Sequence, residues 1–579
     1  MSQHDFITGL VDALARGGVR EVVLSPGYRS APLAFALAAH PGLRLHVVVD
    51  ERAAAFFALG LARARGGPVA LACTSGSAAA NYLPAIVEAF HARIPLVVLT
   101  ADRPIELQHA GAAQTITQPG LYRDFVVHQD ELAEPPALDQ DLPRAPWPAR
   151  VARALLAATD PAGGPVHLNI PLRKPLLPPD PDAPASPLAP PSSSSPAPAS
   201  PLADPRAPAS PWPPPPRLLR GERRLSAADL AGLRDIFAGA RRPLLLAGPM
   251  LRSLAAREGE AILGLAARSG WPLLADALSP ARPRALQRAD AIARADLPPA
   301  DAILWFGQPP TSAALARWIQ RAQGPVVHVV ADGRWADPAF TADHLVWADP
   351  AALAESLDLA PPADPTWLPW WREREAAAEA HLAAHLHDPA APWEGALLAR
   401  VLRAWPGGHV HVASSLAVRD LDAVGHLRPG QRALSSRGVN GIDGTLATAA
   451  GEALGVDAPL LAIVGDLALA HDLGALVHAT ATATDRLVVV VIDNRGGQIF
   501  RQLPLQGRAD FERLFVTPTP VDLAHLAAAA GWHHRRPEGD DALRRDLAGA
   551  HARGRTLIEL TIDPVAAAAA RRAFWQRWR

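Results

Sequence analysis

The chain has 579 residues, which is too many for one hydrophobic core and predicts three or four domains. Hydrophobic residues make up 49% of it and charged residues 20%, as in ordinary globular proteins. Lys and Arg total 56 against 57 Asp and Glu, which gives a formal charge of -1. This balance offers no electrostatic reason to expect nucleic acid or an anionic membrane as a partner.

Cysteine content and the pattern of apolar residues indicate the cellular compartment. The single cysteine, Cys73, excludes an intrachain disulfide and a metal site built from cysteines. Residues 1–18 are typical of an amphipathic helix that ends at Gly17 and Gly18, and not of a signal peptide. No apolar run reaches the roughly 18 residues that a membrane helix needs. We therefore expect a cytoplasmic protein with no membrane partner.

The first 176 residues alternate between strand-like and helix-like segments. Strands are expected at 20–27, 43–50, 68–76 and 95–104, with helical patterns between them. Strands separated by helices predict βαβ units and a parallel sheet. Each expected strand ends in small or polar residues, and ligands of open parallel sheets bind beyond such carboxyl ends.

A change of composition marks the next boundary. Residues 178–216 contain 17 prolines in 39 positions. A segment of this composition has too little apolar surface to offset the entropy lost on ordering, so it predicts an extended linker. A second α/β block follows, with strands expected at 242–249, 271–277, 301–307 and 324–333. A connecting helix comes next, and then a third α/β block, with strands expected at 409–415, 459–466, 486–494 and 556–563. The predicted fold class is α/β, with three sequential parallel-sheet domains; the expected boundaries are 1–177, linker 178–221, 222–360, helix 361–390 and 391–579.

Two strand ends in the third block carry oxygen ligands. Gly465 and Asp466 end one apolar run, and Asn494 follows the next strand 28 residues later. Alone, Asp466 would more often be a helix N-cap. One βαβ step brings neighbouring parallel strand ends to one crevice, so the carboxylate, the amide oxygen and the carbonyls of the Gly-rich turn together suit Mg²⁺. Helix amides after Asp466 would then receive phosphate groups.

This pair resembles the Gly-Asp-x…Asn-Asn signature of thiamine-diphosphate-dependent enzymes, although Leu467 stands where many members have Gly and Asp493-Asn494 replaces Asn-Asn. The resemblance implies thiamine diphosphate bound with Mg²⁺ or Mn²⁺. It assigns the metal to Asp466, the Asn494 side chain and the Gly496 carbonyl, makes Gly465 and Leu467 cofactor contacts, and makes the third block the diphosphate-binding domain.

The same resemblance implies a role for an acid in the first block, which becomes the pyrimidine-binding domain. Glu51 matches the glutamate that hydrogen-bonds the aminopyrimidine ring and relays one proton. Alone, it would be a first-turn acid stabilised by the helix dipole. Ile442 matches the aliphatic residue that props the cofactor into a bent shape, while Ile499 and Phe500 would wall its thiazolium ring; core packing is their alternative. In the family the cofactor bridges two subunits, so a dimer or tetramer is implied.

Longer strings narrow the family. Taken together, the strings "SPGYRSAPL", "DERAAAFFALGLA", "LTADRP", "GAAQTITQ", "SSLAVRDLD", "SSRGVNGIDGTLATAAG" and "NRGGQIF" closely resemble the 2-succinyl-5-enolpyruvyl-6-hydroxy-3-cyclohexene-1-carboxylate synthases of menaquinone biosynthesis. That family decarboxylates 2-oxoglutarate and adds the resulting succinyl carbanion to isochorismate in a 1,4 sense. Both substrates are dianions, which favours arginine ligands. The resemblance assigns the carboxylate derived from 2-oxoglutarate to Ser415, Arg419 and Arg437, and isochorismate to Arg29, Ser30, Arg103 and Gln114.

One departure and two weaker candidates remain. Tyr28 replaces the usual serine at a position expected to touch isochorismate, which changes the shape of the pocket. Arg282 and Arg284 are candidates for substrate contacts from the middle block. The alternatives are another thiamine-dependent 2-oxo acid decarboxylase or carboligase, and a non-catalytic α/β binding protein whose acids and arginines have no chemical role.

Overall fold

The computed structural model describes residues 2–132, 147–177, 216, 219, 221–253, 257–386, 392–477, 486–505, 507–518 and 520–578. These residues form three sheets, and every strand pair in them is parallel. The expected fold class is confirmed. Almost all of the expected linker, 178–221, lies outside the described residues.

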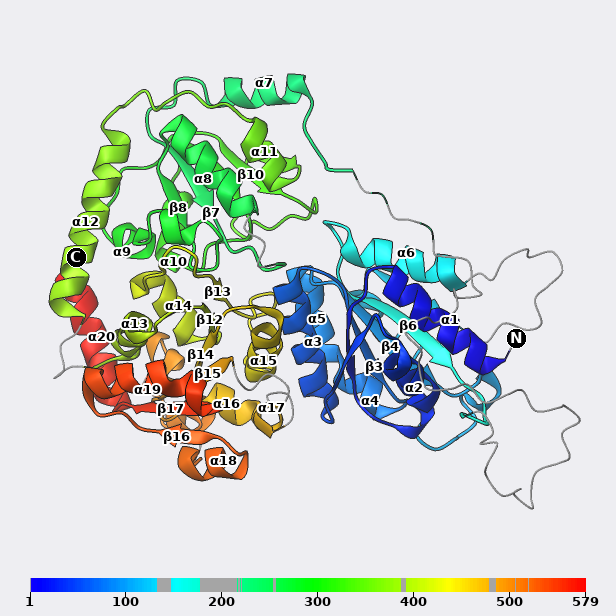
Figure 1. Cartoon of the computed structure of the whole chain (residues 1–579). Coiled ribbons are helices and arrows are strands. Elements are labelled where there is room, and N and C mark those ends of the chain that lie inside the picture. The colour runs from blue at the N-terminus through cyan, green and yellow to red at the C-terminus, as the bar shows by residue number, and fades with distance from the viewer. Residues whose placement is uncertain are drawn as a thin grey trace, which may run out of the picture.

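The front unit, residues 3–171, lies at the right in Figure 1. Its sheet has the strand order β2-β1-β3-β4-β6-β5. Its strands are β1 (Glu21–Leu24), β2 (Arg44–Val47), β3 (Val69–Cys73), β4 (Leu96–Asp102), β5 (His128–Glu131) and β6 (Val166–Pro171). Its helices are α1 (Gln3–Arg16), α2 (Ala31–Ala39), α3 (Glu51–Arg65), α4 (Ser77–Asn81), α5 (Leu83–Ala92) and α6 (Trp147–Thr159).

The middle unit, residues 227–385, lies above the other two in Figure 1. Its sheet has the order β11-β10-β9-β7-β8. Its strands are β7 (Pro243–Ala247), β8 (Leu273–Ala275), β9 (Ala302–Phe306), β10 (Val326–Val330) and β11 (His344–Trp347). Its helices are α7 (Ala227–Ile236), α8 (Arg257–Ser269), α9 (Ala289–Ala293), α10 (Ala313–Ile319), α11 (Pro350–Ser356) and α12 (Trp367–His385), the last of which runs down toward the back unit.

The back unit, residues 394–578, has the order β13-β12-β14-β15-β17-β16, the same order as the front unit when each set is counted along the chain. Its strands are β12 (His409–Val412), β13 (Ala433–Leu434), β14 (Leu460–Gly465), β15 (Leu487–Asp493), β16 (His533–Arg535) and β17 (Thr556–Thr561). Its helices are α13 (Glu394–Ala404), α14 (Leu416–Val424), α15 (Thr445–Gly455), α16 (Asp466–His471), α17 (Leu473–Val477), α18 (Leu523–Ala529), α19 (Gly539–Arg553) and α20 (Pro564–Trp578).

Five strands were not expected from the sequence: β5, β6, β11, β13 and β16. Four of them lie at sheet edges, where a strand has one neighbour and needs little apolar surface. The fifth, β6, is fully buried but carries His167 and Asn169, which bond to Thr100 of β4. Buried polar residues that satisfy each other interrupt the apolar run by which a central parallel strand is recognised.

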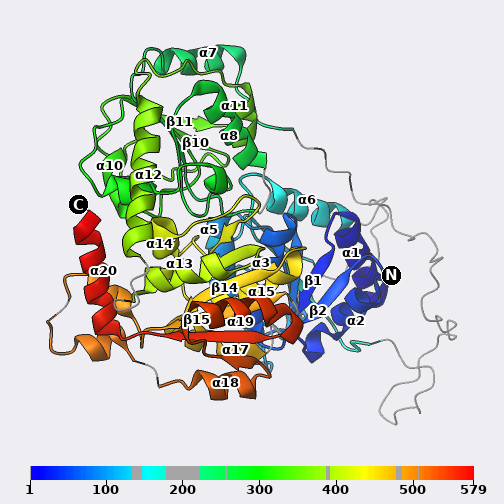
Figure 2. The same cartoon turned by 60° about the vertical axis from the view of Figure 1, so that its left-hand side comes forward.

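Helices α3 and α15 lie side by side in Figure 2, and their contact joins the front and back units. Two glycines allow the contact. A Cβ atom at Gly60 would lie 2.0 Å from the Thr448 carbonyl oxygen, and one at Gly451 would lie 2.0 Å from the Phe57 carbonyl oxygen. Because the opposing atom is a backbone oxygen in both places, no side-chain movement could make room for a Cβ atom there. Residues of both helices belong to one continuous hydrophobic core.

A buried ion pair crosses the same contact. Arg63 of α3 donates a hydrogen bond to Glu452 of α15 at 2.8 Å, and their side chains are 1% and 0% exposed. The second oxygen of Glu452 lies 2.7 Å from the His411 ring nitrogen Nδ1. A charge pair this deep is costly to break because the remaining partner stays buried without compensation.

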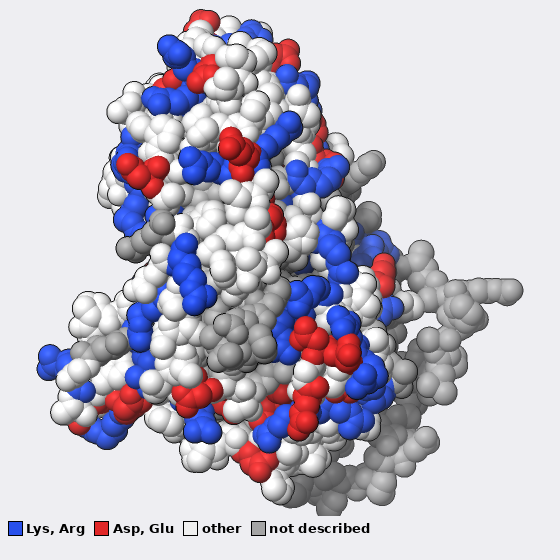
Figure 3. Space-filling model, turned by 90° about the vertical axis from the view of Figure 1, so that its left-hand side faces the viewer, with Lys and Arg blue, Asp and Glu red and all other residues white. Residues whose placement is uncertain are grey.

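The outer surface has no single dominant charge on the face that Figure 3 shows. Lys and Arg are intermixed there with Asp and Glu over the middle and back units. Within the described part of the chain, no helix is both long enough and apolar enough to span a membrane.

We predict that Arg63→Leu lowers the stability of the front–back contact by about 3–5 kcal/mol, because Glu452 is left buried without its cation. Differential scanning calorimetry would show a lower unfolding midpoint. The exposed pair Arg16–Asp12 supplies a control, since Arg16→Leu should change stability by about 0.5 kcal/mol or less. Equal midpoints for Arg63→Leu and the native chain would contradict the prediction.

Candidate active site

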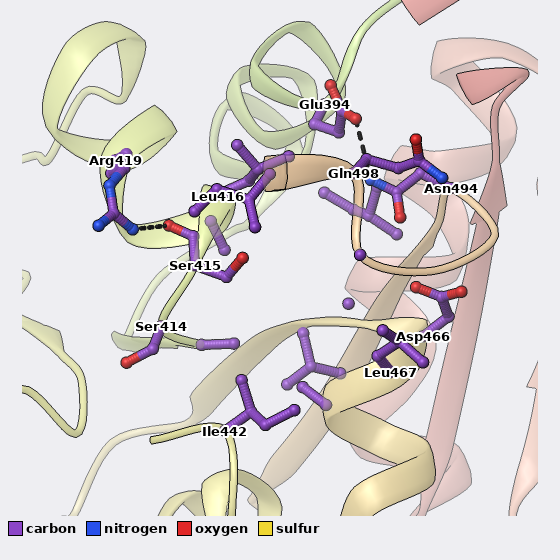
Figure 4. Close-up of a pocket in the computed structure, with 18 of the residues that line it drawn as sticks. Glu394, Ser414, Ser415, Leu416, Arg419, Ile442, Asp466, Leu467, Asn494 and Gln498 are labelled. Atoms are coloured by element: carbon purple, nitrogen blue, oxygen red, sulfur yellow. Dashed lines mark hydrogen bonds between the residues drawn. The ribbon is translucent and has the colours of Figure 1, made fainter. Parts of the chain in front are cut away.

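A cavity of about 350 Å³ opens at the carboxyl edge of the third sheet. The segments that follow β12, β14 and β15 line it, together with the loop that precedes α15 and the first residue of α13. Figure 4 shows Ser415 and Arg419 on one side of this cavity, and Asp466, Asn494 and Gln498 on the other. The carboxyl edge of a parallel sheet is where α/β proteins bind their ligands.

The two strand ends singled out in the sequence meet here. Asp466 begins α16 directly after β14, and its Oδ2 accepts a hydrogen bond from the Gly496 amide at 2.6 Å. Burial raises the pKa of the Asp466 carboxyl to about 6, and the nearby charge of Asp493 adds to the effect. A bound cation would offset both causes, so this carboxylate is suited to holding one.

Asn494 lines the cavity, whereas Asp493 does not. Asp493 faces a separate hollow that it shares with Asp466, and its carboxylate accepts a hydrogen bond from the Arg495 amide. Of the two candidate ligands Asp493 and Asn494, it is therefore Asn494 that lines the cavity together with Asp466 and Gly496. A carboxylate, an amide oxygen and a backbone carbonyl form a set that hard divalent cations accept.

Five further cofactor candidates also line the cavity. They are Gly465, Leu467, Ile442, Ile499 and Phe500. In Figure 4, Ile442, Leu467 and Asp466 are drawn around the same cavity. The cavity thus combines an apolar wall with an oxygen-rich end, as a site for an amphipathic ligand requires.

Three candidates for carboxylate binding lie at the other side of the cavity. Ser415 precedes α14 with a positive φ of 73°, and Arg419 one turn later donates a hydrogen bond to the Ser415 carbonyl at 2.5 Å. Burial lowers the pKa of Arg437, and the nearby Arg419 guanidinium lowers it further. Among the described residues Arg437 has no ion-pair partner. Two arginines that repel each other favour an anionic ligand between them.

The front-unit candidates form a second group, at the carboxyl edge of the first sheet. Arg103 donates a hydrogen bond to Ser75, and Gln114 donates to the Ser75 carbonyl. Arg29 lies close enough to Arg103 for that charge to lower its pKa, although burial is the larger cause. Ser30 is buried and donates its hydroxyl to the Gly27 carbonyl. None of these residues lines the cavity of the back unit, and neither does Glu51.

Three further positions were named from the sequence. Tyr28 lies at the same front edge and is 69% exposed. The assignment of Arg282 to substrate contact is wrong, since this buried side chain donates to the Ala275 carbonyl and to Asp422. Arg284 pairs with Glu260 on the surface.

Sequence reasoning missed five polar residues that line the cavity: Glu394, Ser414, Asp420, Asn440 and Gln498. Ser414, Asp420 and Gln498 stand in family-like strings, as Asn440 does, but no spacing pointed to them. Glu394 begins a helix outside any motif. Asn440 has a φ of 64°, which asparagine tolerates better than most residues, and that conformation was not predictable from its neighbours.

The loop that carries Arg437 and Asn440 rests on the front unit. Glu88 of α5 accepts hydrogen bonds from the Gly438 and Val439 amides at 2.8 and 2.7 Å. A Cβ atom at Gly438 would lie 2.6 Å from the Glu88 carbonyl oxygen, so the approach requires glycine. Glu88 is buried, and its carboxylate fixes the backbone on which Arg437 stands.

Comparison with known families finds two matches along the chain. The family described as thiamine pyrophosphate enzyme, N-terminal TPP binding domain, matches residues 5–121. The corresponding C-terminal TPP binding domain matches residues 420–560. These ranges cover most of the front and back units.

Curated relatives align over nearly the whole chain. The 2-succinyl-5-enolpyruvyl-6-hydroxy-3-cyclohexene-1-carboxylate synthase of Geobacillus kaustophilus is 38% identical over 94% of this chain and 92% of its own length. The protein of the same name from Sorangium cellulosum is 38% identical over 98% and 94%. Among solved structures, benzoylformate decarboxylase from Polynucleobacter necessarius is 16% identical, with a TM-score of 0.68 over 97% of this chain and 99% of that one, which shows a shared fold.

We predict that Glu88→Ala speeds hydrogen exchange at Gly438 and Val439 about 100-fold, because two hydrogen bonds to a charged acceptor are lost. Exchange measured by mass spectrometry on peptides that contain 437–442 would show this. Glu260→Ala, which removes an exposed carboxylate of the middle unit, should leave the same peptides unchanged. Unaltered exchange in Glu88→Ala would mean that other contacts hold the loop.

Proposed function

This chain belongs to the family of 2-succinyl-5-enolpyruvyl-6-hydroxy-3-cyclohexene-1-carboxylate synthases, which are thiamine-diphosphate-dependent enzymes, and we propose that it performs their reaction in menaquinone biosynthesis. In that reaction a succinyl unit from 2-oxoglutarate is added in a 1,4 sense to isochorismate, with release of carbon dioxide. The observation that carries the proposal is the joining of an oxygen-rich end, an apolar wall and an arginine pair in one cavity. We place the enzyme in the cytoplasm.

The proposed metal ligands are Asp466, the Asn494 side chain and the Gly496 carbonyl, with Mg²⁺ or Mn²⁺ as the ion. The raised pKa of Asp466 and the position of Asn494 beside it support this assignment. Both ions accept an all-oxygen set and fill their remaining positions with water or phosphate oxygens.

Thiamine diphosphate, when bound, would supply the electron sink for decarboxylation. We propose that Ile442, Leu467, Ile499 and Phe500 exclude water from its thiazolium end, since they form the apolar wall. Glu51 would hold a proton at the pyrimidine end. Among the described residues its carboxylate has no hydrogen-bond or ion-pair partner, so it is available for this purpose.

The arginines would bind the substrate carboxylates. Arg419 and Arg437, with Ser415, would hold the carboxylate that remains after 2-oxoglutarate loses carbon dioxide. An anion between the two guanidinium groups would relieve their mutual repulsion, which favours binding. Arg29, Ser30, Arg103 and Gln114 would face isochorismate, with Tyr28 beside them.

Two subunits are needed to complete this site, so we propose a homodimer or a tetramer built from dimers. The front-unit candidates and Glu51 do not line the cavity of their own chain. Apolar side chains are exposed at the front edge near them, among them Ile105 at 71% and Val49 at 57%. Exposed apolar groups of this kind mark protein interfaces, and a two-fold dimer would apply each front edge to the other chain's cavity.

The proposed reaction is tested by measuring carbon dioxide release. We predict release with 2-oxoglutarate and isochorismate together, and a product that carries the succinyl unit. Pyruvate replaces 2-oxoglutarate as the control, because it lacks the distal carboxylate that the arginines would bind. Turnover confined to pyruvate would reject the proposal in favour of another thiamine-dependent decarboxylase.

The metal assignment predicts a pH dependence. Because the pKa of Asp466 is raised to about 6, protons compete with the cation for this carboxylate below that pH. The affinity for Mn²⁺ should fall about tenfold for each pH unit below 6 and level off above it. Titration of the full-length protein followed by electron paramagnetic resonance measures this.

A neighbouring variant sharpens that test. Asp493→Asn removes the charge that helps to raise the pKa of Asp466, so the inflection should move to lower pH. An affinity that does not change between pH 5 and 8 would argue against Asp466 as a ligand.

A further inference from the structure

The side-chain amide of Asn494 is held by a buried carboxylate. Its Nδ2 donates a hydrogen bond to Glu394 Oε1 at 2.9 Å, and the two residues are 7% and 6% exposed. In Figure 4 the Asn494 side chain is drawn between Glu394 and Asp466. Among the described residues, the amide oxygen of Asn494 has no hydrogen-bond partner. The bond to Glu394 therefore leaves that oxygen free on the cavity side.

An arginine of the last helix fixes Glu394 in turn. Arg571 of α20 donates to Glu394 Oε2 at 3.0 Å and, through two nitrogens, to both oxygens of Asp420 at 2.5 and 2.7 Å. Its guanidinium lies 4.5 Å from the centre of the Trp393 ring. Burial of Phe574 against Trp393, with ring centres 5.3 Å apart, anchors α20 at this place.

Hydrogen-bond chemistry allows only one arrangement of donors and acceptors from Arg571 through Glu394 to Asn494. A guanidinium only donates, so the Glu394 oxygen that it meets must accept. An ionised carboxylate only accepts, so the group of Asn494 that meets Glu394 must be the NH₂. The carbonyl half of the amide is then turned away from Glu394. Among the described residues, no other contact chooses between the two halves of the amide, which have nearly the same shape.

We propose that Glu394, held by Arg571, is a positioning residue that fixes the Asn494 amide with its oxygen toward a divalent cation at Asp466. This inference rests on the proposed metal role of Asp466 and Asn494. The proposed role connects α20, a helix that contains no motif, to the metal site through Arg571. Arg571 also binds Asp420, the neighbour of the substrate candidate Arg419, so both carboxylates belong to one network. Groups that orient a metal ligand commonly change metal affinity by 10- to 100-fold when they are replaced.

The isosteric change Glu394→Gln tests the orientation directly. Arg571 needs an acceptor, so the glutamine would turn its oxygen to Arg571 and its NH₂ to Asn494. The Asn494 amide would then reverse and present its NH₂ to the cation. We predict that the dissociation constant for Mn²⁺ rises at least tenfold, measured by electron paramagnetic resonance on the full-length protein with thiamine diphosphate.

A second background separates orientation from simple structural damage. In Asn494→Asp the side chain has two equivalent oxygens, so no choice of orientation remains. Glu394→Gln should therefore cause no further loss of Mn²⁺ affinity when it is added to Asn494→Asp. Should Glu394→Gln fold poorly, Arg571→Lys provides the alternative, because lysine keeps the charge but cannot hold both carboxylates, and the dissociation constant should again rise.

The control is Arg572→Ala, which removes the adjacent arginine of the same helix on its exposed side. It should bind Mn²⁺ as the native chain does. If Glu394→Gln binds Mn²⁺ with native affinity, the inference is wrong. It is also wrong if Glu394→Gln lowers the Mn²⁺ affinity by the same factor in the native chain and in the Asn494→Asp chain. If the native chain itself binds no Mn²⁺, the proposed metal site is wrong, and that outcome is distinct from a failure of the positioning role.

Discussion

The packing of α3 against α15 is the constraint on which the rest of the structure depends. Glycines at the crossing bring the two backbones together, and the buried Arg63–Glu452 pair fixes their register. This contact sets the front and back units of one chain in a single arrangement. In that arrangement Glu88 supports the loop of Arg437, while Glu51 stays outside the cavity that contains Asp466. If Glu51 and Asp466 contact one cofactor, as proposed, a single chain does not bring them together in this cavity.

Strand ends were the predictable part of the site. Asp466 and Asn494 follow apolar runs one βαβ step apart, and parallel pairing of β14 with β15 must bring such ends together. The alternation of strands and helices likewise predicted three parallel sheets, since it leaves few topologies open. The family strings then placed Arg419, Arg437 and Ile442 at the same cavity, because those strings are short segments next to the strand ends.

What the sequence could not supply depends on contacts between distant segments. Asn494 and Glu394 are 100 residues apart, and Glu88 and Gly438 are 350 apart, so no local pattern relates them. Arg282 illustrates the opposite error: an arginine named as a candidate for substrate contact instead donates a hydrogen bond to the buried Asp422. The polar strand β6 was missed for a related reason, since its His167 and Asn169 are satisfied by neighbours that only the sheet brings close. Charge alone does not say whether a residue meets a ligand or another part of its own chain.

The central claim is that the front edge of one subunit completes the cavity of another. Two inactive chains, Glu51→Gln and Asp466→Ala, can be co-expressed and purified together, each also being purified alone and checked for folding. Random pairing in a two-fold dimer makes half of the molecules mixed, each with one intact site, so about a quarter of the native activity should return. If Glu51 and Asp466 of the same chain formed the site, no mixed molecule would hold an intact one. A mixture as inactive as its two parents would contradict the account.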